Sequence, residues 1–208
     1  GVCLLKWREG SAVPARQRAK TSPTAFLHLR GIRTKWRVMS SRPEARELTV
    51  LQRNRITPSL QRVTIGGPGL DGFPADQEGG YLKLFLGEGA NGKPIIRTYT
   101  IRHQRESELD IDFALHGGNA AGPATNWSLT AEPGETIKVG GPGAAKPLPA
   151  DHDFYLIAGD MTALPAIGVN LAALPGDARG VAAIEIQNEA DQLALTKPEG
   201  VEIRWLVN

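Results

Sequence analysis

Alternation of apolar and polar side chains over residues 109–116, Leu-Asp-Ile-Asp-Phe-Ala-Leu-His, constrains the fold more than any other stretch. In a β-strand, alternate side chains share a face, so this run predicts a strand with one apolar and one polar face. Further short runs of strand character, separated by turn-rich segments such as 66–69 and 87–92, lie at 47–53, 60–65, 81–86, 95–103 and 136–139. Strands at this spacing predict a small closed antiparallel barrel.

The pattern changes after about residue 150. Residues 153–158 form a compact apolar run typical of a buried strand, and residues 162–174 predict a helix capped by Asp160 or Thr162. Further strands are predicted at 181–187 and 201–207. The order strand, helix, strand is typical of a βαβ unit with a parallel sheet, which indicates a second domain.

The chain therefore divides into residues 1–38, a barrel domain at 39–150 and an α/β domain at 151–208. Residues 1–38 carry nine Lys and Arg against one Glu, which leaves fifteen basic and twenty-one acidic residues in the rest of the chain. We interpret this basic segment as a disordered N-terminal extension that precedes a natural start at Met39. A nucleic-acid-binding arm and a targeting peptide are the alternative interpretations.

Cysteine and histidine usage limits the chemistry of the protein. Cys3 is the single cysteine, which excludes an intramolecular disulfide and a thiolate metal site and indicates a reducing cytoplasm. The histidines are scattered without ligand spacing, so we expect no metal held by side chains of the protein. No apolar run reaches the roughly 20 residues that span a bilayer, so we expect no membrane insertion.

The stretch Arg-Thr-Tyr-Thr-Ile-Arg over residues 97–102 indicates a ligand. On a strand, Arg97 and Tyr99 share a face roughly 6–7 Å apart. Arg97 offers donors that match phosphate oxygens, Tyr99 a surface for a flat ring, and Thr100 a hydroxyl at the edge of that ring. A flavin dinucleotide has this layout. The same alternation also describes the solvent face of an ordinary antiparallel strand.

A glycine-rich segment leads into Pro123, a residue suited to the first position of a short helix. The free amide donors of such a helix N-terminus suit pyrophosphate. The alternative is a crossover helix that plugs one end of the barrel. The second domain has no G-x-G-x-x-G, so its sequence supplies no nucleotide fingerprint.

Four motifs, in order, resemble the siderophore-interacting protein family, a group of flavin-dependent ferric-siderophore reductases related to ferredoxin reductases. They are residues 97–102, 112–117, Gly-Pro-Ala at 122–124 with Trp127, and Ala-Gly-Asp-Met-Thr-Ala-Leu-Pro-Ala-Ile at 158–167. The resemblance implies a six-stranded antiparallel Greek-key FAD-binding barrel followed by a partial Rossmann-like NAD(P)-binding lobe. It also implies that the flavin supplies the redox chemistry and that the protein orients it.

The resemblance assigns residues to each part of the site, with no catalytic residue beyond the flavin. The residues that it implies for FAD are Arg97, Thr98, Tyr99, Thr100, Asp112, His116, Gly117, Gly122, Pro123, Ala124, Thr125 and Trp127. The residues on the NAD(P)H side are Gly159, Asp160, Thr162 and Ala163, at the carboxyl end of the first parallel strand.

The implied partner is a ferric siderophore, reduced with electrons from NAD(P)H or from a ferredoxin. Hard siderophore oxygens hold Fe(III) far better than Fe(II), so one electron loosens the chelate without a protein ligand for iron. Because many ferric siderophores are anionic, Arg102, Arg105 and Lys146 are candidate substrate contacts.

Two departures from the family pattern matter. Met161 stands where the family has an acidic residue, which removes an expected polar contact beside the nicotinamide. The sequence also stops at Asn208, whereas family members continue through further strands and a Trp-x-Ala-Gly-Glu motif. A half sheet predicts an unpaired edge and an uncovered apolar face. The alternatives are therefore an FAD- or siderophore-binding module without NAD(P)H turnover and, more remotely, a nucleic-acid-binding barrel.

Overall fold

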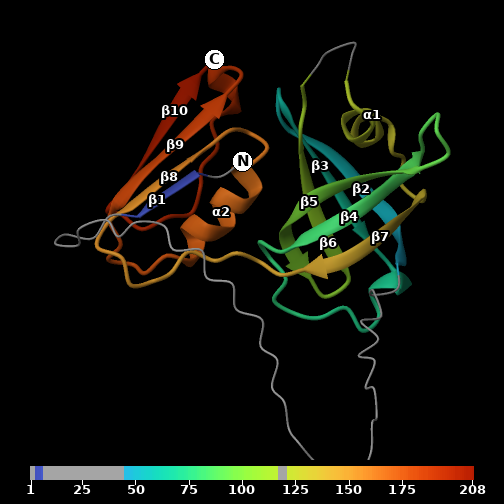
Figure 1. Ribbon diagram of the computed structural model, residues 1–208, viewed down its shortest axis with the longest axis horizontal. Helices are drawn as coiled ribbons and strands as arrows, with labels where there is room; N and C mark the ends of the chain where they lie inside the picture. The colour runs from blue at the N-terminus through green and yellow to red at the C-terminus, as the bar shows by residue number, and fades with distance from the viewer. Residues whose placement is uncertain (1–2, 7–44, 117–120) are drawn as a thin grey trace, which may run out of the picture.

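The computed structural model describes residues 3–6, 45–116 and 121–208. Figure 1 shows two lobes, a β-barrel and a smaller α/β lobe, with one helix of the α/β lobe on the side of its sheet that faces the barrel. This arrangement confirms the predicted order of an antiparallel barrel followed by an α/β unit.

Six strands of the barrel close into one sheet in the order β2-β3-β6-β5-β4-β7, and every neighbouring pair is antiparallel. The strands are β2 (Arg46–Thr57), β3 (Leu60–Gly66), β4 (Tyr81–Glu88), β5 (Pro94–Arg105), β6 (Glu108–Ala114) and β7 (Thr136–Gly143). A short 3-10 helix, η1 (Pro68–Leu70), follows β3. The predicted strands are all present, but β2 and β7 extend about four residues beyond the predicted ends.

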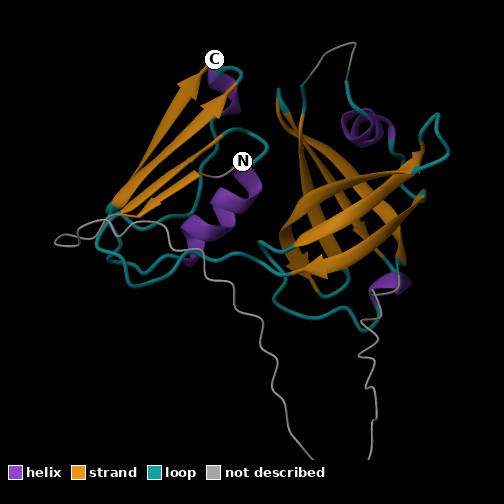
Figure 2. Cartoon of the chain, in the orientation of Figure 1, coloured by secondary structure: helices purple, strands orange, loops and turns teal. Residues whose placement is uncertain are grey.

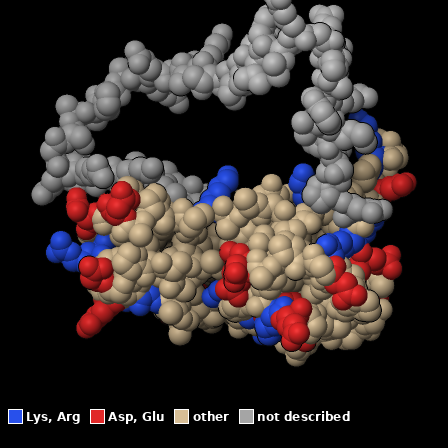
Figure 3. Space-filling view, turned by 90° about the horizontal axis from the view of Figure 1, so that it is seen from below, with Lys and Arg blue, Asp and Glu red and all other residues tan. Residues whose placement is uncertain are grey.

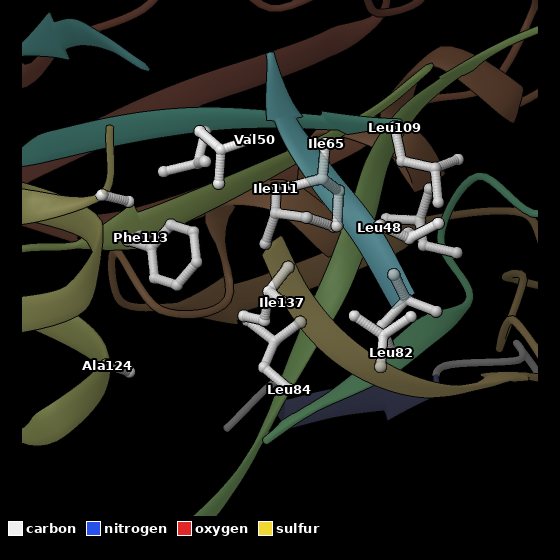
Figure 4. Close-up of a cluster of buried hydrophobic side chains, with 14 of the residues drawn as sticks. Leu48, Val50, Ile65, Leu82, Leu84, Leu109, Ile111, Phe113, Ala124 and Ile137 are labelled. Carbon is white, nitrogen blue, oxygen red and sulfur yellow. The ribbon is translucent and has the colours of Figure 1, made fainter. Parts of the chain in front are cut away.

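The barrel core is built by the apolar faces of these strands. Figure 4 shows the side chains pointing toward one another from opposite walls. The alternation that dominates the sequence puts Leu109, Ile111 and Phe113 of β6 in this core, each at most 1% exposed. The helix α1 (Pro123–Thr130) contributes Ala124 and covers one end of the barrel, where its Trp127 packs against the core.

The polar face of β6 is also buried and carries an ion-pair network. Asp112 accepts from Arg62 Nε at 2.6 Å and from Nη2 at 2.8 Å. Asp110 accepts from Thr64 Oγ1 at 2.8 Å and from both Nη atoms of Arg105, at 2.8 and 2.9 Å. Burial raises the pKa of Asp110, but the hydrogen bonds from Arg105 and Thr64 and the charge of Arg62 outweigh it and hold the pKa at about 2.

The second lobe is a four-stranded sheet in the order β1-β8-β9-β10. Its elements are β1 (Cys3–Lys6), β8 (Tyr155–Gly159), α2 (Leu164–Ala173), β9 (Gly180–Ile186), the 3-10 helix η3 (Glu189–Asp191) and β10 (Val201–Val207). Strands β8, β9 and β10 are parallel, as predicted, whereas β1 pairs antiparallel with β8. Helix α2 begins at Leu164 and not at Thr162, because residues 161–163 form a turn.

Strand β1 falls within the predicted disordered extension at residues 1–38. Its backbone pairs with β8 from Cys3 to Lys6, so this part of the segment belongs to the sheet. The remainder of the predicted extension lies outside the described residues. At the opposite edge, β10 pairs only with β9 among the described strands, and its Leu206 is 53% exposed.

Two surface properties bear on the sequence expectations. None of the helices in the described part of the chain is long and apolar enough to cross a membrane. On the face shown in Figure 3, basic and acidic side chains are intermingled over both lobes and do not form a patch of one sign.

The pKa of Asp110 gives a testable dependence of stability on pH. Because its folded-state pKa of about 2 lies below the ordinary 3.8, its ionised form stabilises the fold above pH 3.8, and this contribution is lost as the pH falls toward 2. We expect Asp110→Asn to lower the free energy of unfolding at pH 7 by about 2 kcal/mol. The difference from wild type should shrink as urea unfolding is repeated from pH 4 to pH 2.

Glu108→Gln is the matched control. Glu108 pairs with the same Arg105 at 2.8 Å but is 37% exposed, so its loss should change stability little. An unfolding free energy of Asp110→Asn equal to that of wild type across this pH range would contradict the role of the network.

Candidate functional site

A cavity of about 660 Å³ lies between the two lobes. This volume is in the range of small-molecule and cofactor sites. Barrel strands β4 and β5 supply one wall, and β8 and α2 of the second lobe supply the other. The lining residues used below are Tyr81, Lys83, Thr98, Tyr99, Thr100, Lys146, Ile157, Ala166 and Asn170.

The barrel wall is held by an aromatic stack that runs into the core. The ring centroid of Tyr99 lies 4.3 Å from that of Phe113, which in turn lies 5.6 Å from that of Trp127. Burial raises the pKa of the Tyr99 phenol, and the charge of Arg97 partly offsets this rise. Tyr99 is therefore fixed from behind while its strand neighbours Thr98 and Thr100 line the cavity with hydroxyl groups.

Tyr81 reaches the same wall because of a glycine opposite it. In the β4–β7 ladder Tyr81 pairs with Gly143, and a Cβ atom on Gly143 would lie 2.0 Å from Tyr81 Cζ. Only glycine at 143 leaves room for the ring. Residues 140–143 form the end of β7.

The residues predicted for the NAD(P)H side lie at the turn between β8 and α2, and none of them is in the cavity lining. Asp160 Oδ1 accepts from Thr162 Oγ1 at 2.5 Å, Thr162 N at 2.9 Å and Ala163 N at 3.2 Å. The hydrogen bond from Thr162 is the largest cause that lowers the pKa of Asp160. A Cβ on Gly159 would meet Ala163 Cβ at 2.8 Å, so this glycine allows the turn to pack closely on β8.

Asn170 of α2 binds the linker between the lobes, the segment that joins β7 to β8, beside the cavity. Its Oδ1 accepts from Leu148 N at 2.8 Å, and its Nδ2 donates to Ala166 O at 3.0 Å. The linker residue Lys146 and the β4 residue Lys83 bring two ammonium groups to the cavity lining. The cavity therefore combines apolar and aromatic surface with cations, which suits a flat anionic ligand.

The structure brings only part of the predicted set into this cavity. Thr98, Tyr99, Thr100 and Lys146 line it. Arg97 is exposed one residue before Thr98, and its Nη1 donates to Ile96 O at 3.0 Å. Asp112 is buried and paired with Arg62, so its carboxylate belongs to the barrel wall and does not face the cavity lining.

The remaining predicted cations lie elsewhere. Arg105 is held by Glu108 and Asp110 on the barrel surface. Arg102 lies against Gly168 of α2, where a Cβ would meet its Nη2 at 3.2 Å. Burial lowers the pKa of Arg102, and the charge of Asp112 opposes this effect. Arg102 therefore packs at the contact between the lobes, outside the cavity lining.

The segment predicted to receive pyrophosphate begins at the end of β6. His116 is exposed, and its Nδ1 lies 3.1 Å from Ala114 O, which requires the ring nitrogen to be the donor. Gly117 lies outside the described residues. Gly122 is the N-cap of α1, Pro123 is its first residue, and Ala124 and Thr125 are buried. Met161, the departure from the family pattern, is 4% exposed in the core of the second lobe.

Tyr81, Lys83 and Asn170 lie outside the set predicted from sequence. The pairing of Tyr81 with Thr100 and of Lys83 with Thr98 places β4 beside the recognised motif. Alternation along β4 could have marked Tyr81 and Lys83 as one face of a strand, but the sequence does not show which strand lies beside β5. Asn170 carries no sequence signal beyond its position on α2.

The fold and this interlobe cavity define a two-lobe protein in which a closed antiparallel barrel and an α/β lobe share a ligand-sized cavity. Two family models match the chain: the siderophore-interacting FAD-binding domain over residues 49–94 and 88–146, and the siderophore-interacting protein over residues 152–208. The chain belongs to the siderophore-interacting protein family, which confirms the resemblance of the four motifs.

Named relatives include the ferric vibriobactin reductase ViuB of Vibrio cholerae, 35% identical over 181 residues that cover 78% of this chain and 66% of ViuB. The NADPH-dependent ferric-chelate reductase of Escherichia coli is 32% identical over 184 residues that cover 78% of this chain and 71% of that protein. The chain thus spans about two thirds of the length of these relatives.

Solved structures of related proteins agree with this family assignment. The siderophore-interacting protein SipS from Aeromonas hydrophila matches with a TM-score of 0.70 and 36% identity, over 80% of this chain and 68% of that one. A ferredoxin-NADP+ reductase from Plasmodium falciparum shares the fold, with a TM-score of 0.58 and 14% identity over 78% of this chain and 70% of that one.

The contacts of Asn170 predict a local change in dynamics. Asn170→Ala removes the acceptor for Leu148 N, so hydrogen exchange of the Leu148 amide should accelerate at least tenfold, while exchange in the barrel strands stays unchanged. Asn170→Asp keeps the acceptor oxygen and should retain the protection. Equal exchange rates at Leu148 in wild type and Asn170→Ala would show that the linker is held by other contacts.

Proposed function

We propose that this chain is a flavin-dependent oxidoreductase that reduces ferric siderophores and releases Fe(II), with electrons from NAD(P)H passing through FAD. The observation that carries the proposal is the cavity between the lobes, with Tyr99 and its hydroxyl neighbours on one wall and Ile157 of β8 and Ala166 of α2 on the other. The names of the relatives, a ferric vibriobactin reductase and an NADPH-dependent ferric-chelate reductase, support this reaction class.

The residues on the barrel wall fit FAD. Tyr99, backed by Phe113, offers a fixed aromatic surface to the isoalloxazine, and Thr98 and Thr100 offer hydroxyl groups at its edge. Arg97 is exposed beside them, and its guanidinium donors other than the one bound to Ile96 O can pair with phosphate oxygens. When bound, FAD supplies the exchange between a two-electron donor and a one-electron acceptor. His116, Gly122 and the start of α1 would hold the far end of the dinucleotide.

The second lobe offers the turn that follows β8 to the electron donor. Parallel sheets bind ligands beyond the carboxyl ends of their strands, where Gly159, Asp160, Thr162 and Ala163 lie. Asp160 holds this turn in shape through three hydrogen bonds. NADPH is the donor that the name of the Escherichia coli relative supports. A ferredoxin is the alternative donor, and we assign the reaction to the cytoplasm.

Two lysines explain why an iron chelate would enter this cavity. Lys83 and Lys146 are exposed at its lining, and their charges attract anionic ferric siderophores. The siderophore oxygens release Fe(II) far more readily than Fe(III), so the protein needs no iron ligands of its own. Among the described residues, no three His, Cys, Asp or Glu side chains come together as a metal site.

The visible absorbance of the purified protein tests this function. We expect a flavin spectrum that bleaches anaerobically with NADPH and returns on addition of a ferric siderophore, with two chelates reduced per NADPH. If the flavin is not reduced by NADPH or NADH but is reduced by a ferredoxin, the electron donor is the ferredoxin. Indifference to all three donors would leave an FAD-binding module without turnover. No flavin after reconstitution with FAD would refute the proposal.

Arg97→Ala tests the phosphate contact. Loss of a charge-assisted hydrogen bond worth roughly 1.5–3 kcal/mol should weaken FAD binding about tenfold to a hundredfold. FAD titration by fluorescence measures this change. Arg204→Ala is the control, because Arg204 is 60% exposed and pairs with Glu202 on the second lobe. Equal FAD affinity in both variants would show that Arg97 does not contact the FAD phosphates.

Tyr99→Ala tests the ring contact. Removing the ring should weaken FAD binding and shift the visible flavin spectrum, because the isoalloxazine loses its aromatic neighbour. Tyr99→Phe keeps the surface and the stack on Phe113, so it should retain the wild-type spectrum. A wild-type spectrum and flavin content in Tyr99→Ala would refute the placement of the isoalloxazine on this wall.

A further inference from the structure

Asp191 connects the two lobes through the two oxygens of one carboxylate. Its Oδ1 accepts from Thr57 Oγ1 at 2.6 Å and from Ser59 N at 2.8 Å, both at the β2–β3 turn of the barrel. Its Oδ2 accepts from Asn188 N at 3.2 Å, within its own lobe. Asp191 is 0% exposed, and Thr57 and Ser59 are each 6% exposed. Over 130 residues separate the partners, so this contact is purely tertiary.

Further hydrogen bonds connect this contact to the segment that carries the predicted cofactor residues. Leu115 N donates to Ser59 O at 2.9 Å, and Gln187 Nε2 donates to Leu115 O at 2.5 Å. The β2–β3 turn, the end of β6 and the end of β9 are therefore joined in one hydrogen-bonded junction. Leu115 is followed directly by His116, which the motif assigns to the FAD site.

The junction is set in a shared apolar core. Leu60 and Ala114 of the barrel are buried in the core cluster of the second lobe, with Ile56 packed against it. In such a setting an unpaired polar group costs far more than it does in water, so the two barrel donors to Asp191 define one arrangement of the lobes. In Figure 2 the short helix that ends at Asp191 lies beside the carboxyl-terminal end of the sheet.

We infer that Asp191 is a positioning residue that fixes the second lobe against the barrel and thereby sets the spacing across the interlobe cavity. The cavity walls come from opposite lobes, with Tyr99 on one side and Ile157 and Ala166 on the other. Any rotation at the junction changes the distance between them. This inference rests on the proposed function, since a donor bound to one wall must meet the flavin on the other.

The chemistry of the carboxylate makes this residue difficult to replace. Both of its oxygens accept hydrogen bonds and neither donates, which matches donors on both sides. An asparagine amide has one oxygen and one NH2 group, so Asp191→Asn sets a donor against a donor in one of the two lobes. Hydrogen bonds from Thr57 and Ser59 lower the pKa of Asp191 against the effect of burial, so the carboxylate stays charged at neutral pH.

A purely local role is the competing explanation. Asp191 and Asn188 form a capping box around η3, which could account for the carboxylate without any effect on the cavity. Thr57→Val separates the two explanations, because it removes the side-chain donor on the barrel, keeps the backbone donor of Ser59 and leaves the capping box intact. Thr57→Ser keeps the hydroxyl and is the rescue variant. Glu189→Gln changes an exposed carboxylate in the same short helix and is the matched control.

The experiment measures lobe geometry and electron transfer on the same full-length proteins. Spin labels at Glu106→Cys in the barrel and Glu199→Cys in the second lobe, in a Cys3→Ser background, report the distribution of interlobe distances. Stopped-flow absorbance reports flavin reduction by NADPH, and dithionite reduction reports a step that needs no second lobe.

We expect Asp191→Asn and Thr57→Val to broaden the distance distribution and to slow reduction by NADPH, Asp191→Asn by about 10- to 100-fold. FAD content and dithionite reduction should stay at wild-type values. The double variant, Thr57→Val with Asp191→Asn, should be no slower than Asp191→Asn alone, because both substitutions break the same contact. Thr57→Ser and Glu189→Gln should match wild type.

A wild-type distance distribution and reduction rate in Thr57→Val would overturn the inference and leave the local role. Broadened distances without any change in the rate of reduction would also overturn it, because spacing would then not govern transfer. If wild type itself is not reduced by NADPH, the proposed function has failed, and the distance distributions still decide whether Asp191 fixes the lobes.

Discussion

Closure of the barrel by β7 is the constraint on which the rest of the structure depends. β7 pairs with β2 along one edge and with β4 along the other, so no strand of the barrel is left with a free edge. This closure holds β4 and β5 side by side as the cavity wall. It also explains the glycine at 143, since the closing strand passes against the ring of Tyr81. Strand pairing around the closed barrel thus fixes the position of this cavity wall.

The second lobe is joined to this barrel by packing as well as by the linker. Leu60 and Ala114 enter its core, Arg102 lies on Gly168 of α2, and Asp191 receives donors from the β2–β3 turn. The spacing between the walls is therefore a property of the folded interface, whereas a flexible linker alone would leave it variable.

Elements with strong local patterns were predictable, and contacts between distant segments were not. Alternation over 109–116 predicted β6 and its apolar face, because strand periodicity is a local property. The same pattern could not show that Asp110 and Asp112 are buried, since their partners Arg62 and Arg105 depend on strand pairing. The motif at 97–102 located one cavity wall, but Lys83 and Asn170 reach it only through tertiary structure. Strand β1 gave no usable sequence signal.

Charge distribution adds a final constraint on the proposed reaction. FAD, NAD(P)H and many ferric siderophores are anions, yet the chain after residue 38 has an excess of acidic over basic residues. This part of the chain, with its net negative charge, repels all three ligands at long range. Several arginines are neutralised in pairs with Asp110, Asp112 and Glu202, so they offer little compensation. Lys83 and Lys146, exposed at the cavity lining, therefore supply the local attraction on which anion entry would depend.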